Sequence, residues 1–319
     1  MTDADRLGSF GWDERAQTLF DDVGVDGAVP ARVVRVERTA CVLVGADGVE
    51  RTSSATTGPA VGDWVAVVAG AVVAVLPRWS ALTRGDPDGA GIQVLAANID
   101  LVFISVPADR PSASRVEREL MLAWESGAQP VVVMTKADLA APDTVEKLRE
   151  RLVGVEVFAT SATTGAGLDI LRTTLQPCRT AVLMGPSGAG KSTLANQLLG
   201  TDSLATGEVR SGDRRGRHTT TSRQLVRVPG GGVLIDTPGL RSLGLVDGGG
   251  EMERVFPDID EWSRACRFRD CRHSAEPDCA VLAAAHDGAL PPARLASYLK
   301  LREELAGQQG RGRGRRGSP

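Results

Sequence analysis

The 319-residue sequence has little net charge, few cysteines and no long apolar run, and each shortage excludes a class of protein. No apolar run approaches the about 18 residues that a membrane-spanning helix requires, so we expect no membrane contact. Asp3, Asp5, Asp13 and Glu14 occupy the N-terminal region without an apolar segment, which predicts a cytoplasmic protein without a signal peptide. A net charge of −3 excludes a global cationic field, so any nucleic-acid contact must come from local patches.

The five cysteines are odd in number, which argues against a disulfide framework. Three of them combine with a histidine in the pattern C-x4-C-x-H-x5-C, formed by Cys266, Cys271, His273 and Cys279. Three thiolates and one imidazole complete a closed tetrahedral site, the structural type for Zn²⁺, with no position left for a catalytic water. We therefore expect one structural zinc, with buried free cysteines as the alternative.

Short β-branched runs separated by glycines characterise residues 27–83. The runs lie at 33–36, 42–44, 65–68 and 72–75. Close spacing of short strands with glycine turns predicts a small barrel or sandwich. The length fits the five-stranded OB-fold, and a generic small β-barrel is the alternative.

From residue 98 the pattern alternates between buried strands and helices. Strands are expected at 101–106, 131–134, 155–159, 181–184 and 233–235, with helices between them at positions that include 113–126 and 144–152. This alternation predicts a doubly wound, mostly parallel α/β sheet. The whole chain is then a multidomain protein, divided into an N-terminal extension (1–26), an OB-fold domain (27–83), a linker (84–97), an α/β domain (98–248), a mostly helical zinc-binding domain (249–305) and a basic flexible tail (306–319).

A phosphate-binding loop is predicted at 185–192, where GPSGAGKS matches GxxxxGK[ST] between an apolar strand and a helix. Glycines allow backbone N–H groups to surround a polyphosphate at the positive end of the helix. Lys191 would reach the β- and γ-phosphates, and the Ser192 hydroxyl would ligate Mg²⁺. The predicted nucleotide-binding residues here are Gly185, Pro186, Ser187, Gly188, Ala189, Gly190, Lys191, Ser192 and Thr193.

A second phosphate-side motif, DTPG, follows the strand that ends at 235. Asp236 has the position of a carboxylate near the Mg²⁺ shell, and Gly239 can donate its backbone N–H to the γ-phosphate. Between the two motifs lies RRGRHTTTSR, in which one threonine of 219–221 can complete the shell when GTP is bound.

A base-reading motif is predicted at TKAD, formed by Thr135, Lys136, Ala137 and Asp138. The Asp138 carboxylate can accept two hydrogen bonds from guanine, whereas adenine offers no donor there. Thr135 stands where asparagine is usual, which predicts weaker binding before changed specificity. The Ser161-Ala162 pair resembles the short loop that touches guanine O6. An ATPase stays open as an alternative, because the phosphate loop itself does not read bases.

The order of these motifs is unusual, since the base-reading motif comes before the phosphate loop and DTPG. In the usual order of a G domain it comes last, so the chain is interpreted as a circularly permuted GTPase.

This combination resembles the circularly permuted, small-subunit-dependent GTPases of bacteria, the RsgA (YjeQ) family. The strings that carry the resemblance are AANID (96–100), GPSGAGKST (185–193), GRHTTTSR (216–223), DTPGLRSLGL (236–245) and the cysteine cluster. The resemblance implies late maturation of the 30S subunit, with GTP hydrolysis stimulated by that subunit and with the OB-like and zinc regions on 16S rRNA. It also implies Lys191 and His218 as catalytic residues, since Leu240 follows DTPG and cannot position water. We expect a monomer; the alternative function is an rRNA-binding placeholder whose GTPase is only a slow timer.

Overall fold

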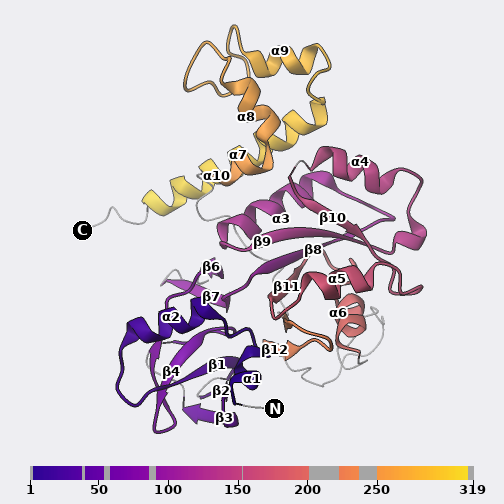
Figure 1. Ribbon diagram of the computed structural model, residues 1–319. Helices are drawn as coiled ribbons and strands as arrows, with labels where there is room; N and C mark the ends of the chain where they lie inside the picture. Colours follow the sequence, from indigo (N-terminus) through magenta and orange to yellow (C-terminus); the bar gives the residue numbers. More distant parts are fainter. Residues whose placement is uncertain are drawn as a thin grey trace, which may run out of the picture.

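The computed structural model describes residues 3–37, 40–53, 58–85, 91–152, 154–200, 223–236 and 250–314. The described chain forms three bodies: an N-terminal β-structure, a central α/β sheet and a C-terminal group of helices (Figure 1). The central body lies between the other two and contacts both (Figure 1).

The N-terminal body is an antiparallel sheet with the strand order β3-β2-β1-β4-β5. Its outer strands β3 and β5 also lie close together, so the sheet curls toward closure. Ala31, Val33, Leu43 and Val65 fill the inside. The strands are β1 (Val29–Val36), β2 (Ala40–Gly45), β3 (Gly48–Ser53), β4 (Trp64–Val68) and β5 (Ala71–Val75).

Two short helices complete this body, α1 (Asp3–Gly8) and α2 (Glu14–Val23). The Asp13 side chain accepts from the Ala16 N–H at 2.8 Å and caps α2. Leu7 and Ala16 pack against Trp64 of β4 in one buried cluster. The segment expected to form an N-terminal extension therefore contributes Leu7 and Ala16 to the core of the first body.

The connection to the central sheet is an antiparallel hairpin of β6 (Ala81–Gly85) and β7 (Ile92–Ala97). Leu82, Leu95 and Ala96 are buried in the main core. Part of the segment 84–97, expected as a linker from its turn-rich composition, is thus an ordered strand that packs against the central body.

The central sheet has the strand order β10-β9-β8-β11-β13-β12, parallel except for the antiparallel pair β12–β13. Helices cover both faces, as the alternating pattern predicted. The strands are β8 (Leu101–Pro107), β9 (Gln129–Thr135), β10 (Glu156–Ala159), β11 (Thr180–Met184), β12 (Gln224–Arg227) and β13 (Val233–Asp236). The helices are α3 (Ala113–Glu125), η1 (Ala137–Leu139), α4 (Thr144–Arg151), α5 (Leu168–Thr174) and α6 (Lys191–Leu199).

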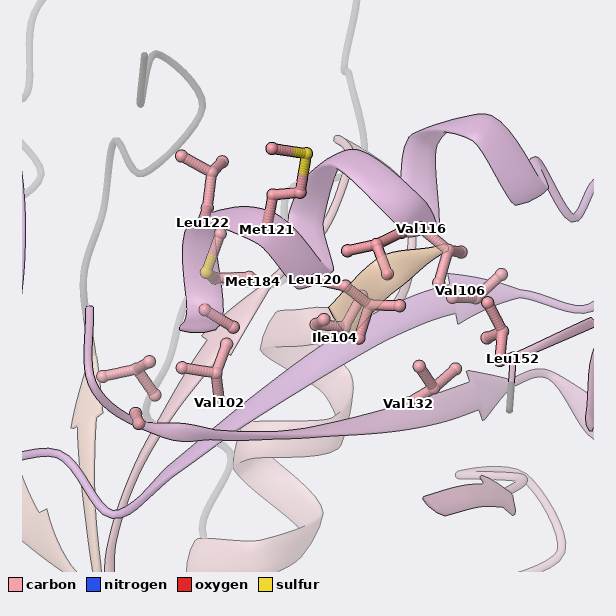
Figure 2. Packing of buried hydrophobic residues seen from close by; sticks show 14 of the residues in the cluster. Val102, Ile104, Val106, Val116, Leu120, Met121, Leu122, Val132, Leu152 and Met184 are labelled. Carbon is pink, nitrogen blue, oxygen red and sulfur yellow. The ribbon is translucent and has the colours of Figure 1, made fainter. Parts of the chain in front are cut away.

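Separate apolar clusters lie on the two faces of this sheet. On one face, Val116 and Leu120 of α3 lie over Ile104 of β8 and Val132 of β9 (Figure 2). On the other face, α5 and α6 cover Leu101 and Phe103. Successive side chains of β8 therefore enter opposite layers, as a strand buried on both sides requires.

The first two bodies share one continuous sheet, because Arg35 of β1 pairs with Gln224 of β12. The third body consists of α7 (Glu251–Val255), α8 (Pro257–Ser263), α9 (Ala280–His286) and α10 (Pro292–Gly314), and its apolar side chains join the core over α3.

Helix α10 begins at Pro292, a residue favoured at the first position of a helix, and continues to Gly314. Residues 306–314 are therefore helical, although their composition predicted a flexible tail. Glu303, Glu304 and Leu305 favour helix and carry it into that segment. Within the described residues, no helix combines the length and apolarity needed to cross a membrane.

Candidate nucleotide site and candidate metal centre

The predicted phosphate loop connects β11 to α6 at the carboxyl end of the central sheet. Gly185, Gly188 and Gly190 have φ angles of 134°, 77° and 80°, which side chains other than hydrogen rarely allow. A Cβ atom on Gly185 would lie 2.5 Å from the carbonyl oxygen of Ser105. Glycine is thus required where the loop passes close to Ser105 of β8. The loop leads directly into the N-terminus of α6.

Lys191 is folded back into this loop. Its Nζ donates to the carbonyl oxygens of Gly185 at 2.8 Å and Pro186 at 2.6 Å. Ser192 and Thr193 are exposed on the first turn of α6, and Ser187 and Gly188 are exposed at the tip of the loop. Charged and hydroxyl groups are therefore presented together around one short loop.

The predicted base-reading residues follow β9 and lie beside the loop after β10. The Thr160 N–H donates to the Met134 carbonyl at 2.7 Å, and the Ala137 N–H donates to the Thr160 carbonyl at 3.0 Å. Lys136 has a φ of 56°, which turns the chain into η1 and leaves the Asp138 side chain exposed. Ser161 is buried and Ala162 half-buried at the adjoining turn, so the two predicted base-side segments lie side by side.

Thr135 links the base side to the phosphate loop. Its buried hydroxyl donates to the Ala189 carbonyl at 2.7 Å, and a Cβ on Gly190 would lie 3.5 Å from its side chain. The sequence indicated a lost amide contact at this position. The structure shows that the replacement hydroxyl ties the end of β9 to the loop 54 residues later.

The backbone of Asp236 ends β13, next to β11, and so reaches the same edge of the sheet as the phosphate loop. The predicted residues Gly239 and His218 and the threonines 219–221 lie outside the described residues, as does the position of the Asp236 side chain.

The four predicted metal ligands converge in the third body. Their ligand atoms lie within 4.8 Å of one another. Cys266 Sγ is 3.9 Å from Cys279 Sγ and 3.6 Å from His273 Nδ1. Zinc–sulfur bonds of about 2.3 Å place tetrahedral ligand atoms roughly 3.8 Å apart, so the donor set and its spacing fit one zinc ion.

The loop between these ligands is held by Glu276. Its carboxylate accepts from the backbone N–H groups of Ser274 and Arg272 at 3.0 and 2.9 Å. Hydrogen bonds from the backbone of Ser274, with those of Arg272 and Ala275, lower the pKa of Glu276 to about 2. His273 itself is buried, with a φ of 54°, so the turn presents its ring inward.

Sequence reasoning missed one charged residue near the phosphate loop. Glu119 of α3 is 8% exposed and lines a cavity with Pro186. Glu119 lies in a stretch whose apolar residues, such as Val116 and Leu120, predict only a helix with a buried face. No local sequence pattern distinguishes Glu119 from other charged residues of that helix.

The arrangement defines a class of protein: a P-loop GTPase fold in which the base-side strand precedes the phosphate loop in the chain. Residues 75–246 match the family model described as RsgA GTPase. A curated relative, "Small ribosomal subunit biogenesis GTPase RsgA" of Streptomyces coelicolor, is 48% identical across 93% of this chain and 86% of its own. The relative with the same name in Opitutus terrae is 42% identical across 94% of this chain and 90% of its own.

Two solved structures agree. YjeQ from Thermotoga maritima has a TM-score of 0.63 and 26% identity, covering 88% of this chain and 99% of its own. YloQ, described as a circularly permuted GTPase, has a TM-score of 0.64 and covers 89% and 96%; at 23% identity it supports the fold alone. This chain therefore belongs to the RsgA family of GTPases, which hydrolyse GTP.

Proposed function

We propose that this GTPase acts in the late maturation of the small ribosomal subunit, as the printed names of its relatives state for those proteins. One observation carries the proposal. The similarity covers 93% of the chain, so it includes the N-terminal β-structure and the cysteine cluster as well as the nucleotide-binding body. All three parts of the molecule are then expected to serve the same task, in the cytoplasm and as a monomer.

In this proposal the loop 185–190 surrounds the GTP phosphates, and Lys191 exchanges its two carbonyl partners for phosphate oxygens. Lys136 and Asp138 hold the guanine, with Ala137, Ser161 and Ala162 beside it. Thr135 maintains the link between the two halves of the site. Ser192 and Asp236 would hold Mg²⁺, which supplies charge neutralisation at the phosphates.

The reaction is attack of water on the γ-phosphorus, with cleavage of its bond to the β–γ bridging oxygen. Lys191 stabilises negative charge as that bond breaks. His218 is the proposed group that orients or deprotonates the water, and Gly239 donates its N–H to the γ-phosphate. Leu240, which follows DTPG, has no polar side-chain atom with which to orient the water.

The two outer bodies are the proposed contacts with 16S rRNA. The order β3-β2-β1-β4-β5, with β3 near β5, supports an OB-fold, whose strands and loops bind nucleic acids in other proteins. In the third body, Arg267, Arg269 and Arg272 are exposed around the cysteine cluster, and Arg267 is paired with Asp278 at 2.9 Å. These arginines are the proposed phosphate-contacting patch. One structural zinc would hold this patch in place.

The test is turnover of GTP and ATP with and without purified 30S subunits. We expect strong stimulation by 30S that is confined to GTP, loss of activity in Lys191→Ala, and loss of stimulation in His218→Ala. Slow turnover unaffected by 30S would favour a passive rRNA-binding placeholder. Stimulated turnover that survives His218→Ala would remove only the role of that histidine.

A further inference from the structure

A cavity of about 60 Å³ lies between the end of β8, the first turns of α3 and the phosphate loop. Val106 and Val116, which lie close together in Figure 2, supply apolar lining. The polar and loop residues that line it are Ser105, Arg110, Ser112, Arg115, Glu119 and Pro186. A carboxylate therefore lies next to the loop proposed to hold a polyphosphate.

Glu119 is poorly compensated in this place. Its Oε1 is 3.7 Å from Arg115 Nε, longer than a hydrogen bond, and its side chain is 11% exposed. The Ser105 hydroxyl, buried in the same lining, has no hydrogen-bond partner among the described residues. Burial raises the pKa of Glu119 to about 7, against the opposing charges of Arg115, Lys191 and Arg118. The group thus changes charge near neutral pH.

Pro186 connects Glu119 to Lys191. This residue lines the cavity, and its carbonyl oxygen accepts from Lys191 Nζ at 2.6 Å. The positive charge of Lys191 therefore acts on the Glu119 carboxylate and lowers its pKa, against the effect of burial. When nucleotide phosphates enter the loop, the same ammonium group must bind the phosphate oxygens.

We propose that Glu119 is a positioning residue of the phosphate loop: its carboxylate balances the charge of Lys191 in the empty loop and competes with nucleotide phosphates for it. Nucleotide then binds more weakly when Glu119 is ionised than when it is protonated. The inference rests on the proposed assignment of 185–192 to the phosphates. The charged groups near Glu119 are Arg115 of α3, Arg110 from the preceding turn and Lys191 of α6. Arg118 of α3 also acts on Glu119, but its guanidinium is paired with Glu304 of α10 at 2.9 Å.

The direction of the pH dependence follows. Below the pKa of Glu119 the carboxyl is neutral and does not repel phosphate. As pH rises through that pKa, the carboxylate forms and affinity falls. Bound phosphate in turn disfavours the carboxylate, so nucleotide binding shifts the titration further upward.

The test measures the dissociation constant of a fluorescent GDP analogue for the full chain between about pH 6 and about pH 8. Wild-type affinity should fall roughly three- to tenfold more over this range than that of Glu119→Gln, as expected for one partly screened charge. Glu303→Gln, an exposed carboxylate on α10, should follow the wild type. Parallel profiles for wild type and Glu119→Gln would overturn the inference.

A second variant separates titration from packing. Arg115→Gln removes a cation that favours the carboxylate, so the midpoint of the pH profile should move upward while the fold remains intact by thermal melting. An unmoved midpoint would exclude the role of Glu119. Lys191→Ala should lose binding at every pH. Wild-type protein that fails to bind GDP at any pH would instead refute the proposed phosphate site.

Discussion

The two joints that attach the outer bodies to the central sheet each contain one buried arginine stacked on an aromatic ring. Arg32 lies 4.9 Å from the ring centre of Trp64, and Arg294 lies 4.8 Å from that of Phe256. Their hydrogen-bond partners differ in kind: Arg32 donates mainly to neutral backbone carbonyls, whereas Arg294 donates to two carboxylates.

At the first joint, Arg32 of β1 is completely buried. It donates to the carbonyls of Phe10, Gly62 and Asn98 and to the Thr180 hydroxyl at 2.8 Å. Burial lowers the pKa of Arg32 to about 10, with Asp100 and Asp63 opposing the shift. A single side chain thereby satisfies groups from the N-terminal segment, the N-terminal sheet and the central sheet.

At the second joint, Arg294 of α10 bonds Glu117 of α3 at 2.9 Å and Asp258 of α8 at 2.7 Å. Glu117 is also completely buried and accepts from Arg151 at 2.8 Å and from the Ser297 hydroxyl. This joint is therefore a network of charges from four helices. A backbone carbonyl partner cannot be replaced by mutation, whereas a carboxylate partner can. The two joints should therefore differ in whether a second substitution restores the stability lost with the first.

The largest expected effect comes from removing metal with a strong chelator. The metal ligands lie on the irregular segment 264–279, which connects α8 to α9. Without metal, α8 and α9 should therefore lose protection from hydrogen exchange while β1 and β4 keep theirs. Hydrogen-exchange mass spectrometry measures both. Cys279→Ser should reproduce the loss, and Cys178→Ser, outside the cluster, should not; protection of α9 that survives chelation would contradict a structural zinc.

Breaking the ionic joint comes next. Glu117→Leu leaves Arg294 and Arg151 without their shared carboxylate and should cost about 3 kcal/mol in chemical denaturation. The double variant Glu117→Leu/Arg294→Met should recover part of this loss, because it removes the uncompensated charge as well. Strict additivity of the two single changes would contradict the network.

Arg32→Met breaks the carbonyl joint and should lower the free energy of unfolding by about 2 kcal/mol, because buried carbonyls lose their donor. Here no second change of a charged neighbour should help. Asp100 accepts a hydrogen bond from the Thr180 N–H at 2.8 Å, so the loss of Arg32 does not leave this carboxylate without a partner. Adding Asp100→Asn to Arg32→Met should therefore not raise the free energy of unfolding above that of Arg32→Met alone. Recovery in that double variant would mean that both joints depend on charge in the same way.

The smallest effect concerns the partly exposed pair between Arg118 of α3 and Glu304 of α10, 2.9 Å apart. Arg118→Gln should cost less than about 1 kcal/mol, and high salt should reduce the difference further. Equal losses in Arg118→Gln and Glu117→Leu would show that burial does not set the strength of this joint.

Much of the candidate site was predictable because its signals are local. The glycines of 185–190 and the spacing of Cys266, Cys271, His273 and Cys279 report backbone shape and ligand geometry within a few residues. The central-sheet strands β8, β9, β10, β11 and β13 were predicted from short apolar runs, whereas β12 was not. The hairpin strand β7 and the helical extension of α10 were not, because turn-forming and charged residues there suggested irregular chain.

The sequence by itself determined the glycine pattern of 185–190, the order of the motifs and the spacing of the cysteine cluster, since each depends on neighbours along the chain. Only the tertiary structure decided that the Thr135 hydroxyl bonds Ala189, that Arg32 joins Phe10 to Thr180, and that Glu117 meets Arg294. The same holds for Glu119 beside Pro186. These partners are tens to more than a hundred residues apart, and a buried charge becomes favourable or costly only through the groups that folding brings against it.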